Sequence, residues 1–252
     1  MNARHMLPLL FAALWPFTAG ANEVSVAVAA NFTAPMKAIA EVFAAATGHQ
    51  ATLSFGSSGK FYAQITNGAP YEVFLSADQE KPQSLEEAGE VVPGSRFTYS
   101  LGALALWSAD SDIAVNADTL EAGDINKLAI ANPKLAPYGA AALEVMDKLG
   151  VRESLAARLI QGENIAQTYQ FVSSGNARLG FVALSQVYAD GAITSGSAWI
   201  VPDNLYTPIR QDAVLLLKGR DNPAAVALLD FLKGPQARKI MISYGYRLAA
   251  ND

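Results

Sequence analysis

Short apolar runs alternate with amphipathic stretches along the chain from Val24 onward. The apolar runs have the length and composition of buried strands, and the stretches between them repeat apolar residues at helical spacing. Strands that alternate with helices in this way indicate βαβ units on a mostly parallel sheet, and therefore an α/β fold. The predicted strands are Val24–Ala29, Ala51–Phe55, Val73–Leu75, Leu101–Trp107, Leu128–Ala131, Leu179–Ala183 and Ala213–Leu217.

Prolines, asparagines and glycines mark where the helices between these strands begin and end. Pro35, Pro137 and Pro223 stand in first helical turns, where a missing N–H costs no hydrogen bond. Gly48 is placed to end the first helix. The predicted helices span residues 33–47, 60–66, 78–88, 137–149, 165–174, 223–233 and 235–244.

The chain contains no low-complexity segment, fixed-period repeat or flexible linker. The pattern restarts at Leu101–Trp107 and returns to an apolar strand after Pro202 and Pro208. We therefore predict two α/β lobes that the chain visits in turn. The first lobe comprises residues 23–105 plus 206–252, and the second comprises residues 106–205.

The first 21 residues have the pattern of a cleavable signal peptide. Arg4 precedes an apolar stretch from Met6 to Phe17, and Ala19-Gly20-Ala21 supplies small residues for cleavage after Ala21. The apolar stretch is too short for a permanent membrane anchor. A buried N-terminal helix is the alternative interpretation. Without a cysteine after the cleavage site, a lipid anchor is not expected, and we predict an exported protein.

Composition excludes several classes of function. Beyond residue 21 the chain has 17 basic and 23 acidic residues, which argues against nucleic acid as a partner. It has no cysteine, so disulfides and thiolate zinc sites are excluded. His49 is the only histidine after residue 21, so a site with several histidines is excluded as well.

Several predicted strands end in a small polar residue and turn directly into a helix. These turns lie at Ala30-Asn31, Ser57-Ser58, Ser76, Pro137-Tyr138 and Asn164-Ile165. Ligands of open α/β sheets bind at the carboxyl ends of strands, and helix N-termini present unpaired N–H groups there. Several such termini around one cleft would bind an anion without Lys or Arg. Each residue taken alone is better explained as an ordinary N-cap, and only the whole set supports an anion site.

The segment Gly56–Lys60 resembles two catalytic motifs but fits neither. Phe61 stands where a Walker A loop needs Ser or Thr, and Gly56-Ser57-Ser58-Gly59 lacks the spacing of a nucleophile elbow. We expect Lys60 to be solvated. A serine hydrolase that uses Ser58 would need His49 as its base, and an adhesive domain without a cleft is a third possibility. We predict that the protein is not an enzyme and uses no cofactor.

A set of motifs along the chain resembles the periplasmic molybdate-binding proteins of ABC transporters. The resemblance runs from Val24 to about Tyr246, and it implies a type II periplasmic binding protein with its ligand in an interlobe cleft. The motifs are Val28-Ala29-Ala30-Asn31-Phe32, Ser54–Gly59, Gly68-Ala69-Pro70, Val73–Asp78, Pro137-Tyr138-Gly139 and Phe231–Ala237.

The resemblance implies which residues hold the oxyanion. They are Ala30, Asn31, Ser58, Tyr138 and Ile165, as contacts to the molybdate oxygens and not as direct ligands of the molybdenum. Ala183 stands where some members have a ligand tyrosine, and we expect the Tyr138 hydroxyl to compensate. Molybdate only accepts hydrogen bonds, so Ser, Asn and backbone N–H groups suit it.

The resemblance also implies a monomer in the periplasm that delivers molybdate, and tungstate as a near-isostere, to an inner-membrane permease. A receptor for another oxyanion such as sulfate is the alternative.

Overall fold

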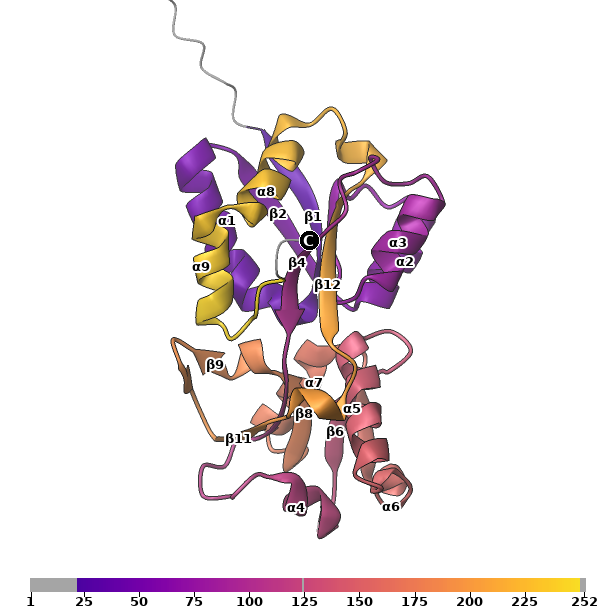
Figure 1. Cartoon of the computed structure of the whole chain (residues 1–252), viewed down its shortest axis with the longest axis vertical. Helices are drawn as coiled ribbons and strands as arrows, with labels where there is room; N and C mark the ends of the chain where they lie inside the picture. The colour runs from indigo at the N-terminus through magenta and orange to yellow at the C-terminus, as the bar shows by residue number, and fades with distance from the viewer. Residues whose placement is uncertain (1–21, 124, 250–252) are drawn as a thin grey trace, which may run out of the picture.

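The computed structural model describes residues 22–123 and 125–249. The predicted signal peptide, residues 1–21, and the last three residues of the predicted first lobe lie outside this range. Two five-stranded sheets, each flanked by helices, form the upper and lower parts of Figure 1. The predicted α/β fold class on two sheets is confirmed. The sequence pattern predicts mostly parallel sheets, but each sheet has two parallel and two antiparallel strand pairs, because β12 (Ile209–Leu215) and β5 (Leu104–Ser108) run against their neighbours.

The first sheet has the strand order β2-β1-β3-β12-β4. β1 pairs in parallel with β2 and β3, whereas β12 is antiparallel to β3 and β4. Alternate residues of β1 face opposite layers: Val26 packs with α1, α8 and α9, and Ala27 packs with α2 and α3. The strands are β1 (Glu23–Ala29), β2 (Gln50–Gly56), β3 (Val73–Leu75), β4 (Phe97–Gly102) and β12 (Ile209–Leu215). The helices are α1 (Thr33–Thr47), α2 (Ser58–Thr66), α3 (Glu80–Glu87), α8 (Pro223–Lys233) and α9 (Pro235–Ser243).

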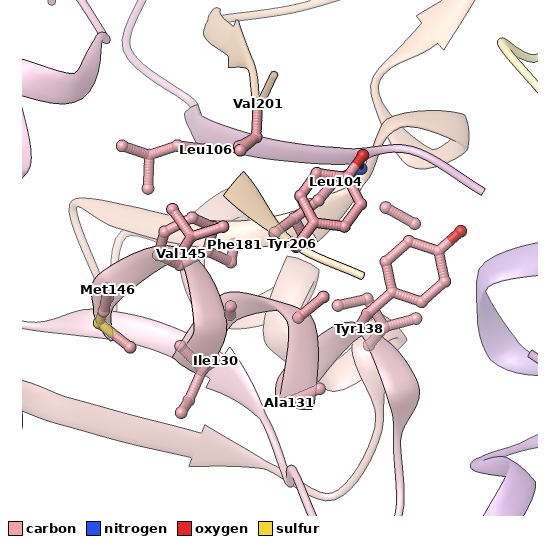
Figure 2. Packing of buried hydrophobic residues seen from close by; sticks show 14 of the residues in the cluster. Leu104, Leu106, Ile130, Ala131, Tyr138, Val145, Met146, Phe181, Val201 and Tyr206 are labelled. Carbon is pink, nitrogen blue, oxygen red and sulfur yellow. Dashed lines mark hydrogen bonds between the residues drawn. The ribbon is translucent and has the colours of Figure 1, made fainter. Parts of the chain in front are cut away.

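The second sheet has the order β11-β5-β8-β6-β7. Leu104 and Leu106 face α5, while Ala105 and Trp107 face α7. Figure 2 shows the α5 side, where Val145 and Met146 pack with Ile130 and Phe181. The strands are β5 (Leu104–Ser108), β6 (Leu128–Ala131), β7 (Leu159–Gly162), β8 (Leu179–Ala183) and β11 (Ser197–Ile200). The helices are α4 (Ala117–Glu121), α5 (Pro137–Lys148), α6 (Arg152–Leu155) and α7 (Ile165–Ser173).

Short elements complete the chain. The hairpin of β9 (Tyr188–Ala189) and β10 (Ala192–Ile193) turns at Asp190-Gly191, both with positive φ. The 3-10 turns are η1 (Ala30–Phe32), η2 (Ala156–Arg158), η3 (Leu184–Gln186), η4 (Asp203–Leu205) and η5 (Leu217–Gly219).

The structure corrects two of the predicted strands. Leu101–Trp107 is not one strand, because β4 ends at Gly102 in the first sheet and β5 begins at Leu104 in the second. β12 begins at Ile209, four residues before its predicted start. Its polar residues Gln211 and Asp212 interrupt the apolar pattern but are buried and hydrogen-bonded.

The described residues contain neither a membrane-spanning helix nor a cluster of metal-binding side chains. Between residues 22 and 249, residue 124 apart, no helix is long and apolar enough to span a membrane. Within the same part of the chain, no group of three or more His, Cys, Asp or Glu residues is placed to hold a metal ion.

Candidate functional site

A narrow cavity lies between the two halves of the molecule. Its empty volume is about 200 Å³, including the part open to solvent. The space in which the centre of a water molecule fits is only about 10 Å³. The described residues that line it are uncharged: Ala29, Ala30, Asn31, Gly56, Ser57, Ser58, Ala77, Ala136, Pro137, Tyr138, Asn164 and Ile165. A space of about 10 Å³ holds roughly one water, so a larger ligand requires the two halves to separate before it enters.

Four N-termini of helical segments meet at this cavity. The first sheet supplies η1 and the start of α2, and the second supplies the starts of α5 and α7. The structure therefore brings together the five residues that the resemblance named. Ala30, Asn31 and Ser58 line one side of the cavity, and Tyr138 and Ile165 belong to the other half of the molecule.

Ser57, not Ser58, is the N-cap of α2. The Ser57 hydroxyl accepts a hydrogen bond from the Lys60 N–H at 3.4 Å. Ser58 is nevertheless buried, and its Oγ accepts a hydrogen bond from the Ala77 N–H at 2.9 Å. Because Oγ accepts in this bond, the Ser58 hydroxyl proton can be donated to a ligand.

The helix starts in the second half leave backbone donors free. Pro137 has no N–H, so Tyr138 is the first residue of α5 with a backbone donor. The Asn164 side chain accepts from the N–H groups of Ala166 and Gln167. Among the described residues, no acceptor bonds the backbone N–H of Ser58, Tyr138 or Ile165. First-turn amides have no intrahelical partner and carry the positive end of the helix dipole, so this arrangement favours an anion.

The Asn31 side chain is held by protein groups. Its Nδ2 donates to Gln211 Oε1 at 2.7 Å and to the Tyr246 hydroxyl at 2.9 Å, and it also lies 3.5 Å from the Tyr138 hydroxyl. An amide nitrogen has two protons, and both have acceptors here. The donor that Asn31 can offer to a ligand is its backbone N–H, which has no acceptor within the 3-10 turn. Its buried side chain is no N-cap.

The Tyr138 hydroxyl belongs to the same hydrogen-bonded group of side chains. Figure 2 shows the ring at the edge of the apolar cluster, with its hydroxyl pointing away from it. That hydroxyl accepts from Gln211 Nε2 at 3.4 Å and lies 3.5 Å from Asn31 Nδ2. Burial raises the pKa of Tyr138 well above its ordinary value, so the hydroxyl stays neutral. In these bonds the hydroxyl accepts, so its proton can still be donated, and the expectation that it replaces the missing tyrosine donor at Ala183 stays a prediction.

Two contacts between the halves lie beside the cavity. The Gly59 N–H donates to the Leu135 carbonyl at 2.9 Å. A Cβ at Gly59 would lie 3.0 Å from the Leu135 Cα, so a side chain there would press against the opposite backbone. Lys60 Nζ forms an ion pair with Glu163 Oε1 at 2.7 Å, and both side chains are about half exposed. Lys60 points to Glu163 and is not part of the cavity lining.

The hydrolase alternative lacks its catalytic base. His49 precedes β2, and Ser58 follows the other end of that strand. Seven residues of strand separate them by roughly 20 Å, whereas a base must be within hydrogen-bond reach of the hydroxyl. His49 instead lies at the turn from α1 into β2, as its sequence position predicted.

Sequence reasoning missed two residues next to the site. The Ala77 N–H fixes the Ser58 hydroxyl, and Gln211 bonds both Asn31 and Tyr138. Gln211 could have been noticed in the sequence as a polar residue beside an apolar strand. Nothing in the sequence indicates Ala77, because its backbone N–H makes the contact.

Comparisons with known proteins agree with this fold. Residues 24–247 match the model of the bacterial extracellular solute-binding protein family. Two curated relatives are each described as "Molybdate-binding protein ModA". The one from Azotobacter vinelandii is 57% identical over 95% of both chains. The one from Rhodobacter capsulatus is 54% identical over 90% of this chain and 89% of the relative.

A solved structure gives the same answer. The Azotobacter vinelandii periplasmic molybdate-binding protein superposes with a TM-score of 0.87 at 41% identity, and the match covers 90% of this chain and all of that one. The resemblance stated from the sequence is thereby confirmed. The chain belongs to the bacterial extracellular solute-binding protein family.

Proposed function

We propose that this protein captures molybdate, with tungstate as a near-isosteric second ligand, and delivers it to an ABC transporter permease. The observation that carries the proposal is the uncharged cavity where free first-turn N–H groups meet. Unprotonated tetrahedral oxyanions such as molybdate, tungstate and sulfate accept hydrogen bonds only, so a shell of donors suits them. The names of the curated relatives support molybdate among the possible oxyanions.

A neutral shell also explains how an acidic protein binds an anion. Burying a cation beside the ligand carries a desolvation cost that can exceed the attraction. Hydrogen bonds from backbone amides avoid this cost, because the dipoles are already fixed by their helices. We propose that Asn31, Tyr138 and Ile165 contribute backbone N–H groups, that Ser58 contributes its hydroxyl, and that Ala30 supports the same turn.

The delivery role follows from the proposed compartment and from the two halves of the molecule. We propose that residues 1–21 are removed on export, and that the protein acts in the periplasm as a monomer without a cofactor or a catalysed reaction. The two lobes, residues 23–105 with 206–252 and residues 106–205, would open to admit the ligand. At strand level the first crossing lies at Ala103, between β4 and β5.

Competition calorimetry on the protein without residues 1–21 tests the ligand. We expect tight, similar binding of molybdate and tungstate, because their sizes are close. Sulfate has the same charge but is smaller, so in a rigid cage some hydrogen bonds would stretch and weaken. A few charge-assisted bonds at about 1.5–3 kcal/mol each give discrimination of several orders of magnitude. Phosphate carries a proton that needs an acceptor. Displacement of molybdate by millimolar sulfate would instead favour the sulfate receptor.

A further inference from the structure

Gln211 lies outside the cavity lining but contacts residues on two of its walls. It is a fully buried residue of β12. Its Oε1 accepts from Asn31 Nδ2 at 2.7 Å and from the Tyr99 hydroxyl at 3.1 Å. Its Nε2 donates to the Tyr138 hydroxyl at 3.4 Å. One side-chain amide thus connects η1, on the first sheet, with the start of α5, on the second.

The chain leaves space for this connection at Gly102. A Cβ at that position would lie 2.1 Å from the Tyr138 hydroxyl oxygen and 2.6 Å from Gln211 Nε2. Gly102 is the last residue of β4, directly before the chain crosses to the second sheet, and it pairs with Ile209 of β12. The Gln211 amide and the Tyr138 hydroxyl therefore occupy the volume that any side chain at the crossing would fill.

We propose that Gln211 is a positioning residue that sets the width of the oxyanion cavity, and so its preference for large oxyanions. The inference rests on the function proposed above. Gln211 does not touch the ligand; it fixes Asn31 and Tyr138, whose backbone N–H groups face the ligand from the two halves. If the amide is lost, the two walls lose their shortest side-chain link, and the 3.5 Å contact of Asn31 Nδ2 with the Tyr138 hydroxyl is left to set their separation.

The role needs both ends of a neutral amide. The carbonyl oxygen accepts from Asn31, and the nitrogen donates to Tyr138. A protonated glutamic acid also has one acceptor and one donor, whereas an ionised carboxylate only accepts. Burial and a nearby dianion both raise the pKa of a carboxyl group. Gln211→Glu should therefore work when protonated and fail when it ionises.

The side chains around Gln211 in the wild type should not add a pH dependence of their own to such a measurement. Tyr99, Tyr138 and Tyr246 bond to this group of side chains, and burial raises the pKa of all three above the ordinary tyrosine value. The neighbouring Asp212 is paired with Arg96 at 3.0 Å and accepts from Thr98. None of the three tyrosines changes charge between about pH 6 and about pH 9.

The test measures the affinity of the wild type, Gln211→Glu and Gln211→Met for sodium molybdate and sodium sulfate, from about pH 6 to about pH 9. We expect wild-type affinity to be flat. The Glu variant should bind near wild-type strength at the low end and lose about tenfold or more as the carboxyl ionises. The Met variant has a similar size and no hydrogen bonds, and it should bind molybdate more weakly at every pH, with a reduced preference over sulfate.

Asn222→Asp is the matched control. Asn222 Nδ2 also donates to two acceptors, the Glu23 carbonyl and Glu72 Oε1, but it caps α8 and does not line the cavity. This variant should lose stability and keep the wild-type affinity and preference.

Two outcomes are decisive. A wild type that does not bind molybdate would overturn both the proposed function and this inference. A wild type that binds, with a Glu variant that shows no pH dependence or a Met variant with unchanged preference, would overturn the inference alone.

Discussion

Among the side-chain contacts that join the halves of this molecule, two sets beside the cavity differ in their access to water. One is the buried group of Asn31, Tyr138, Gln211 and Tyr246, which Ser185 joins through its hydroxyl bonds to the Asn31 carbonyl and Tyr246. The other is the ion pair of Lys60 with Glu163, whose side chains are each 51% exposed. The cavity adjoins both, because it includes Asn31 and Tyr138 as well as Ser58 and Ile165.

The difference indicates which contact controls the site. An exposed ion pair is screened by water and salt and contributes about 0–1 kcal/mol. A buried polar group that loses its partner costs about 1–3 kcal/mol, since no water replaces the bond. We therefore expect changes in the buried group to alter ligand binding, and changes at the ion pair to alter it little.

The largest effect should come from a charge placed in the cavity between these contacts. Ser58→Asp can still accept from the Ala77 N–H, but it puts a carboxylate against the dianion. We expect calorimetry to show no molybdate binding. Ser58→Ala loses one bond to a charged ligand and should cost about 1.5–3 kcal/mol. Ser173→Asp, on an exposed position of α7, is the charge-matched control. Unchanged affinity in Ser58→Asp would place the anion elsewhere.

Gly102→Ala should have the next largest effect, because it acts on the buried group without touching the ligand. The new Cβ would overlap the Tyr138 hydroxyl at 2.1 Å, so Tyr138 or Gln211 must move. We expect molybdate affinity to fall by about tenfold or more, in addition to about 1–3 kcal/mol of stability lost to overpacking. Gly234→Ala, between α8 and α9 at a negative φ, is the control. If Gly102→Ala were destabilised but kept the wild-type molybdate affinity, the buried group would not control ligand binding.

The sequence predicted most of the fold because the deciding signals are local. Apolar runs located β1, β3, β6 and β8, and first-turn prolines located α5 and α8. The crossing at Ala103 was missed, because β4 and β5 read as one apolar run while their pairing partners, β12 and β8, lie far along the chain. The short strands β7 and β11 were missed as well, since four residues give little periodicity.

For the site, the sequence predicted which residues line the cavity, but not which of their atoms can donate a hydrogen bond to a ligand. Local motifs located the helix starts, and all five named residues line the cavity. Whether the Asn31 amide faces the ligand or the protein depends on Gln211 and Tyr246, which are 180 and 215 positions away along the chain. Such long-range partners leave no periodic pattern, so the Asn31 and Tyr138 side chains could not be assigned from the sequence.

A smaller effect should appear when the buried group is titrated. Burial raises the pKa of Tyr246 to about 12, while an unfolded tyrosine ionises near pH 10. The folded state therefore holds the proton longer, so stability is intact below about pH 10 and falls as the pH rises toward about 12. Tyr246→Phe should lower stability near neutral pH by about 1–3 kcal/mol, with a shallower alkaline decline. Denaturant melts across this range measure both, and parallel curves for the two proteins would contradict the assignment.

The smallest effect is expected at the exposed ion pair, and it sets the lower limit of the comparison. Lys60 follows the Gly56–Gly59 turn, where a lysine resembles a phosphate ligand, yet its ammonium lies 2.7 Å from Glu163 Oε1. A cation that already has a carboxylate partner is a poor donor to an oxyanion. Lys60→Ala should therefore change the free energy of molybdate binding by about 0–1 kcal/mol, and this change should be smaller at high salt. Glu163→Ala should match it, because either change removes the same pair. A loss in Lys60→Ala as large as that in Ser58→Asp would make Lys60 a ligand, and the contrast between the exposed and buried contacts would fail.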